Sequence, residues 1–146
     1  MEYEEYERQC VLRREENERH LVVFEKALSE TGLSEKTINK HLRNVEFFLN
    51  VYLLREAPES MAEGCYRISD YLGNFFIRKC MWSTSASIKS TAASLKKFYK
   101  CMLNNGNIKT TDYETLIETI KLEMEFWQEE SRVYNDPNSH NPFLSF

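Results

Sequence analysis

The chain has 146 residues, of which 42% are hydrophobic and 29% are charged, and it carries a net charge of −4. This balance is ordinary for a single soluble domain. It excludes a protein whose whole surface is positive, so any binding to nucleic acid must come from one face. With only four glycines and three prolines the chain has few turn-forming residues, and we expect an all-α fold.

Residues 2–30 are predicted to form a helix, with an apolar Leu-x-x-Phe-x-x-x-Leu face that begins at Leu21. The first part, residues 1–15, is mostly charged and is either an extension of this helix or a frayed arm. Gly32 marks the end of the element, because glycine readily adopts the left-handed conformation that commonly follows a helix. We assign residues 16–133 to one helical domain.

A second helix is expected to begin after the N-cap residue Ser34 and to run to about Leu54, before Pro58. Its predicted buried stripe contains Ile38, Leu42, Val45, Leu49 and Tyr52. A third helix is predicted over residues 63–81. Gly73 within it indicates close packing against a neighbour, because glycine in an exposed helix costs about 1 kcal/mol relative to alanine.

A Ser/Thr-rich turn follows and leads into a fourth helix, for which Ser85 or Ser87 is the expected N-cap. The apolar residues of this helix recur at the spacing of one helical face. The side chains predicted to be largely buried in this region are Trp82, Leu95, Phe98 and Tyr99. The helix is expected to end at Asn104-Asn-Gly-Asn, which is a strong stop signal.

Lysines occupy another face of the fourth helix: Lys89, Lys96 and Lys100 repeat at helical spacing, and Lys97 lies beside them. Residues 71–111 include seven basic residues and no acidic one, whereas the rest of the chain is acidic. A face of lysines and small side chains can approach a polyanion closely, and serine hydroxyls with free N–H groups at the helix start suit a phosphate oxygen. The alternative is an ordinary solvated surface.

A fifth helix is predicted from Thr111 or Asp112 to about Val133, with one acidic side. Its apolar side is expected to fold back on the bundle and contains Tyr113, Leu116, Ile117, Ile120, Met124 and Trp127. Residues 134–146 hold turn-forming residues and two prolines, and we interpret them as a tail or linker.

No pattern of a metal or cofactor site occurs in the sequence: histidines and cysteines do not cluster at ligand spacing, and a glycine-rich phosphate loop is missing. His41 is expected to be a partly buried structural residue. The cysteines form no Cys-x-x-Cys pair and the acidic N-terminus is unlike a signal peptide, which predicts reduced thiols in a cytoplasmic protein. No apolar run is longer than four residues, so no membrane span is predicted.

Two segments resemble helices of one known family. Residues 32–49, Gly-Leu-Ser-Glu-Lys-Thr-Ile-Asn-Lys-His-Leu-Arg-Asn-Val-Glu-Phe-Phe-Leu, are similar to the second helix of the core-binding domain of tyrosine recombinases. Residues 83–100, Ser-Thr-Ser-Ala-Ser-Ile-Lys-Ser-Thr-Ala-Ala-Ser-Leu-Lys-Lys-Phe-Tyr-Lys, are similar to its fourth helix. This SAM-like domain precedes the catalytic domain of phage integrases, and the resemblance covers about residues 16–106.

The resemblance implies a compact bundle of four to five helices that forms half of a clamp on double-stranded DNA during DNA integration or recombination. It implies that the second and fourth helices face the DNA. The contact candidates that it suggests are Lys36, Lys40, Arg43, Ser85, Ser87, Lys89, Ser90, Lys96, Lys97 and Lys100. The further partners that it implies are a recombinase catalytic domain and another protomer.

The catalytic motif of that family is missing, because His20, His41 and His140 all lack an arginine three positions later. We therefore expect a DNA-binding domain without enzymatic activity, either a stand-alone protein or the first part of a longer recombinase. The alternative is a helical protein–protein interaction module that kept the fold and lost DNA binding, which the acidic composition and the aromatic fifth helix favour. An enzyme built on an unrecognised site is a third alternative.

Overall fold

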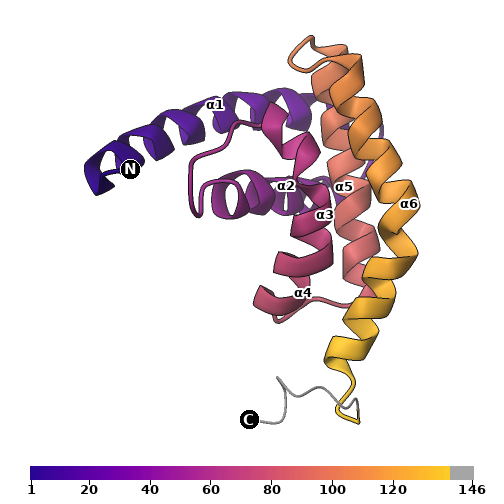
Figure 1. The fold of residues 1–146 in the computed structure, drawn as a ribbon. Helices are drawn as coiled ribbons and strands as arrows, with labels where there is room; N and C mark the ends of the chain where they lie inside the picture. Colours follow the sequence, from indigo (N-terminus) through magenta and orange to yellow (C-terminus); the bar gives the residue numbers. More distant parts are fainter. Residues whose placement is uncertain (139–146) are drawn as a thin grey trace.

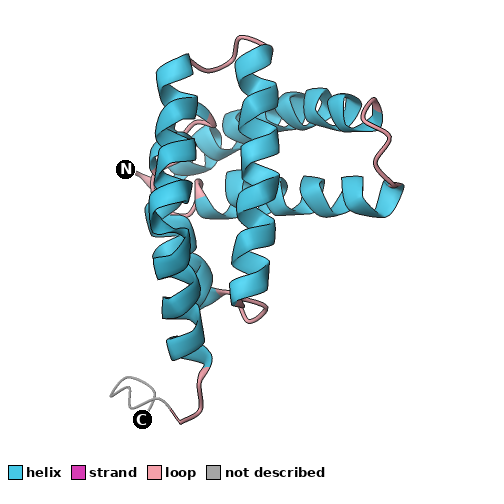
Figure 2. Ribbon diagram, turned by 90° about the vertical axis from the view of Figure 1, so that its right-hand side faces the viewer, coloured by secondary structure: helices cyan, strands magenta, loops and turns pink. Residues whose placement is uncertain are grey.

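The computed structural model describes residues 1–138, and within this range it contains helices and turns but no strand. The long helices are α1 (Tyr3–Ser29), α2 (Glu35–Phe47), α5 (Ser85–Asn104) and α6 (Thr110–Asn135). Figure 1 shows α5 and α6 side by side, with α1 and α2 crossing behind them. The view from the side in Figure 2 shows the same two pairs, each joined by a short turn. The prediction of an all-helical fold is therefore confirmed for the described residues.

The charged segment 1–15 belongs to α1, which runs without a break from Tyr3 to Ser29. Cys10 is buried, and the Tyr6 hydroxyl donates a hydrogen bond to the carbonyl of Leu54. These contacts explain why the segment is an extended helix and not a frayed arm. At the other end of α1, Gly32 has φ +80°, as expected for a residue that ends a helix by turning left-handed.

The second predicted helix is shorter and less regular than its periodicity suggests. Ser34 caps α2 by accepting a hydrogen bond from the Thr37 N–H at 3.2 Å, as predicted. A π-helical turn, Phe48–Tyr52, continues α2, so the helical backbone ends just before the expected residue, Leu54. Of the residues in the predicted buried stripe, the core fully encloses Val45, Leu49 and Tyr52. Contrary to the prediction, Ile38 and Leu42 are only partly buried and pack against the edge of the core.

The third predicted helix, over residues 63–81, is wrong as a continuous element. The chain forms a 3₁₀ turn (Ala62–Tyr66), a short α3 (Ile68–Asp70), a π-helical turn (Tyr71–Phe75) and a short α4 (Phe76–Lys79). Gly73 lies in the π turn, and a Cβ atom there would meet the Trp127 indole at 2.7 Å. The predicted close packing at Gly73 is therefore confirmed, and its partner is α6.

The start of α5 differs from the prediction by one residue. Thr84 is the N-cap and accepts a hydrogen bond from the Ser87 N–H at 3.0 Å, while the Ser87 hydroxyl accepts one from the Thr84 N–H at 2.7 Å. Ser87 therefore completes the cap and Ser85 takes no part in it through its hydroxyl. Within the helix Leu95, Phe98 and Tyr99 are fully buried, as predicted.

Trp82 is a correction, because its side chain is 55% exposed although burial was predicted. Its ring meets Phe47 and Phe76 edge to face, with centroid distances of 5.4 and 6.3 Å, and within residues 1–138 the rest of the ring is left largely open. Periodicity could not place this residue, since it lies in the loop between α4 and α5 and belongs to no helical face.

Helix α6 folds back along α5 and buries Leu116, Ile120 and Trp127, with Met124 half-buried. The predicted intramolecular docking of the fifth helix is thus confirmed. The helix extends to Asn135, two residues beyond the expected boundary. No helix within residues 1–138 has the length and apolarity that crossing a membrane requires.

Candidate functional site

The exposed side of α5 carries the lysine face, which we define as Lys89, Lys96, Lys97 and Lys100. The helix places these side chains opposite the buried side that packs into the core. Every ion pair within residues 1–138 is made by an arginine, so the lysine face has no carboxylate partner there. Lys100 also contacts an aromatic ring, because its Nζ lies 5.3 Å from the centroid of the Tyr113 ring. These charges are therefore available to an external anion.

Helix α2 contributes a second set of exposed cations, Lys36, Lys40 and Arg43. Its contact with α5 is a buried polar junction that sequence reasoning missed. Nδ1 of His41 lies 2.7 Å from the Ser94 hydroxyl, and the Asn44 side-chain amide donates to the same oxygen at 3.0 Å. The Ser94 hydroxyl donates to the Ser90 carbonyl at 3.3 Å. The hydroxyl proton of Ser94 is used in this bond, so in the contact between His41 and Ser94 the hydrogen is carried by Nδ1 of His41.

The junction brings the cations of the two helices close to one another. Burial lowers the pKa of His41, and the charges of Lys97 and Lys40 lower it further. One lysine belongs to α5 and the other to α2, so both lie within electrostatic reach of the same imidazole. The lowered pKa favours the neutral form of His41, and exposed cations of α2 and of α5 lie near this junction.

The predicted serines do not all share this open surface. The Ser87 hydroxyl is engaged in the cap of α5 and also donates to the Trp82 carbonyl at 3.0 Å. Ser85 is half-buried beside α6, and its carbonyl accepts a hydrogen bond from the Gln128 side chain at 3.0 Å. The Ser90 hydroxyl is buried and has no partner within the described residues. The basic residues are therefore the accessible part of the predicted set.

Reactive groups are scarce around this surface. Burial raises the pKa of Cys65 to about 12 and that of Cys80 to about 11, so both thiols stay protonated and inert. Within residues 1–138 no three His, Cys, Asp or Glu side chains gather in a way that could hold a metal ion. The exposed charges of this surface suit the binding of an anion.

No protein-family model, curated protein or solved structure matches the chain. The candidate site therefore rests on the geometry of α2 and α5 alone.

Proposed function

We propose that this chain is a helical DNA-binding domain of the core-binding type that tyrosine recombinases use, and that it takes part in DNA integration or recombination without catalysing it. The observation that carries the proposal is the lysine face of α5, which has no ion-pair partner within the described residues and adjoins the cations of α2. The catalytic steps would belong to a recombinase catalytic domain.

The charge distribution supports a phosphate backbone as the partner. The chain as a whole has a net charge of −4, yet residues 71–111 include seven basic residues and no acidic one, and four of these basic residues form the lysine face of α5. Lysines that neutralise phosphates release condensed counterions, which gives binding that is strong at low salt and weak at high salt. Ala93 lies within the lysine face, and its short side chain permits a close approach of the α5 backbone to a groove.

Charge reversal of the lysine face tests the proposal. A labelled duplex titrated at low salt should bind the parent protein with a Kd of about 10⁻⁴–10⁻⁶ M, the range of non-specific binders. The double variant Lys96→Glu/Lys100→Glu should lose this binding and keep the melting temperature, because both side chains point away from the core. The matched control Arg14→Glu/Arg19→Glu changes the net charge equally on α1 and should bind as the parent does.

The salt dependence provides a second readout of the same experiment. Binding by the parent should fall steeply as salt rises, and the control variant should show the same slope. If the parent fails to bind at tens of micromolar protein, or if the Lys96→Glu/Lys100→Glu variant binds equally well, the DNA-binding proposal is wrong.

A specific observation favours the second candidate, a protein–protein interaction module. On the outer side of α6 Leu122 is 71% exposed and Phe126 is 61% exposed, with Val133 two turns further along. Exposed apolar side chains aligned on one helix face are typical of a docking surface. Association through this face would depend on apolar burial, so it should persist at a salt concentration that removes DNA binding. The variant Leu122→Glu/Phe126→Glu should abolish it.

A further inference from the structure

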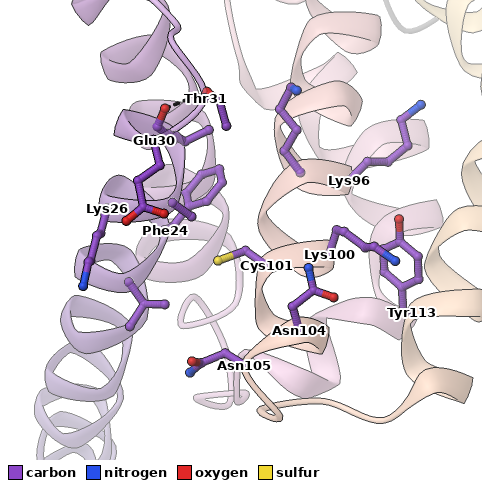
Figure 3. Close-up of a pocket in the computed structure, with 14 residues that line it drawn as sticks. Phe24, Lys26, Glu30, Thr31, Lys96, Lys100, Cys101, Asn104, Asn105 and Tyr113 are labelled. Carbon is purple, nitrogen blue, oxygen red and sulfur yellow. Dashed lines mark hydrogen bonds between the residues drawn. The ribbon is translucent and has the colours of Figure 1, made fainter.

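A groove of about 660 Å³ lies between the C-terminal halves of α1 and α5. It reaches Tyr113 at the start of α6. Figure 3 shows Phe24 and Cys101 facing each other across the gap between the two helices, while Lys96 and Lys100 extend from α5 towards the side of Tyr113. A volume of this size is typical of pockets that hold small molecules.

The floor of the groove is apolar and firmly packed. Phe24 and Leu28 are 1% and 4% exposed, and the Phe24 ring meets the Phe98 ring edge to face at a centroid distance of 5.3 Å. Val23 and Ala27 of α1 add small apolar side chains to the wall. Phe24 and Leu28 are already covered by the protein, so a ligand would bury its hydrocarbon surface against the half-buried side chains of Val23 and Ala27.

The rim of the groove is basic. The lysines that line it are Lys26, Lys96, Lys97 and Lys100, and the one acidic residue among the lining residues is Glu30. None of the four lysines makes an ion pair within residues 1–138. Both helices end near the groove, and their C-terminal carbonyls offset part of the positive charge. A formal excess of three positive charges nevertheless remains on the rim.

We propose that this groove binds a small amphiphilic anion, namely a medium-chain carboxylate whose hydrocarbon lies along the half-buried Val23 and Ala27 and whose carboxylate pairs with Lys97. A groove with an apolar floor and a basic rim suits a ligand that has both a hydrocarbon part and an anionic group. The wall from Val23 to Glu30 is about 10 Å long by the rise of an α-helix, which suits a medium chain better than a long one. A neutral chain would leave the lysines without a partner.

Occupation of the groove has a consequence for DNA binding, and this consequence rests on the proposed function. Lys96, Lys97 and Lys100 belong to both the lysine face and the rim of the groove. A carboxylate held by these residues neutralises charge that the phosphates would use. The ligand therefore competes with DNA and acts as a regulator of the same surface.

Calorimetric titration of the full chain with decanoate, below its critical micelle concentration, tests the binding step. We expect saturable binding of one decanoate per chain, with much weaker binding of decanol and of decyltrimethylammonium. Lys97→Gln should weaken decanoate binding about fivefold, as expected for loss of one exposed charge pair. Lys89→Gln, a substitution on the same helix outside the groove, should leave the affinity unchanged.

A substitution that fills the groove gives an independent test of its location. Ala27→Trp should abolish decanoate binding while the thermal melt stays cooperative, and Lys97→Gln keeps the proposal testable if that variant fails to fold. Equal binding of decanoate and decanol, no binding by the parent, or unchanged affinity in Lys97→Gln would overturn the proposal.

The two proposals fail in different ways. Decanoate should displace a labelled duplex from the parent protein, whereas Ala27→Trp, which changes the groove and leaves the lysine face intact, should bind the duplex and resist displacement at the same decanoate concentration. If decanoate binds but the duplex does not, the DNA-binding proposal is wrong and the groove site stands. If the duplex binds and decanoate does not, the groove site is wrong and the DNA-binding proposal stands.

Discussion

Gly73 is the residue on which the contact between α6 and the π turn depends. A Cβ atom at this position would lie 2.7 Å from the indole of Trp127, which is itself 1% exposed and cannot move aside. We expect Gly73→Ala to destabilise the fold by about 1–3 kcal/mol, the usual cost of overpacking, despite the better helix propensity of alanine. Chemical denaturation measures this change in the free energy of unfolding. Asn74→Ala, at the exposed neighbouring position, is the control and should change stability far less.

His41 makes stability depend on pH. Its pKa in the folded state is lowered, first by burial and then by the charges of Lys97 and Lys40, so the unfolded chain binds the proton more readily. The stability that neutral His41 provides is fully present above the unfolded pKa of about 6.5 and is lost as pH falls towards the folded pKa. Melting temperatures measured from pH 7.5 to 5 should therefore fall more steeply in the parent than in His41→Asn. Parallel profiles would contradict the assignment.

At the scale of elements, the cap of α5 is a contact whose loss can be measured in isolation. Thr84 and Ser87 satisfy one another's backbone N–H groups at the start of a helix that has no acidic residue in its first turn. Thr84→Ala should cost about 0.5–2 kcal/mol in unfolding free energy. Ser85→Ala, one position further, removes a hydroxyl that makes no capping bond and should be nearly neutral. A larger loss for Ser85→Ala than for Thr84→Ala would mean that the cap is misassigned.

The elements also show how far sequence reasoning reaches. Helical spacing correctly predicted the buried side of α5 and the docking side of α6, because a face that is apolar over several turns has to be buried. It failed over residues 62–79, where the backbone breaks into 3₁₀ and π turns. Packing of Gly73 against Trp127, a partner distant in sequence, accompanies the break, and no local pattern contains that information.

The candidate site also contains residues that the sequence could predict and contacts that it could not. The basic residues on α5 could be predicted from their spacing, since an exposed lysine needs only a helix and an outward direction. The junction that joins α5 to α2 could not, because His41 and Ser94 are 53 positions apart and neither carries a distinctive motif. Ser90 was expected on the open surface, yet its hydroxyl is buried. Around α5 the position of Ser90 lies beside the positions of the exposed lysines, so helical spacing alone does not tell a covered side chain from an exposed one.

At the scale of the whole molecule, the lysine face and the exposed apolar side of α6 are separate surfaces. The lysine face lies on α5 beside the exposed cations of α2, and Leu122 and Phe126 are the most exposed apolar side chains of α6. One surface suits a polyanion and the other suits a protein. Since they occupy different helices, a single molecule could hold DNA and a protein partner at the same time.

The two tryptophans of the chain occupy opposite environments, and this gives the molecule two distinct optical reporters. Trp127 is enclosed by the core at 1% exposure, so we expect its emission to be shifted to the blue and to be insensitive to aqueous quenchers. Trp82 is 55% exposed in the loop before α5, so we expect its emission to respond to solvent and to any ligand that covers the loop. In Trp82→Phe the remaining fluorescence reports folding alone, and the difference from the parent isolates events at the surface.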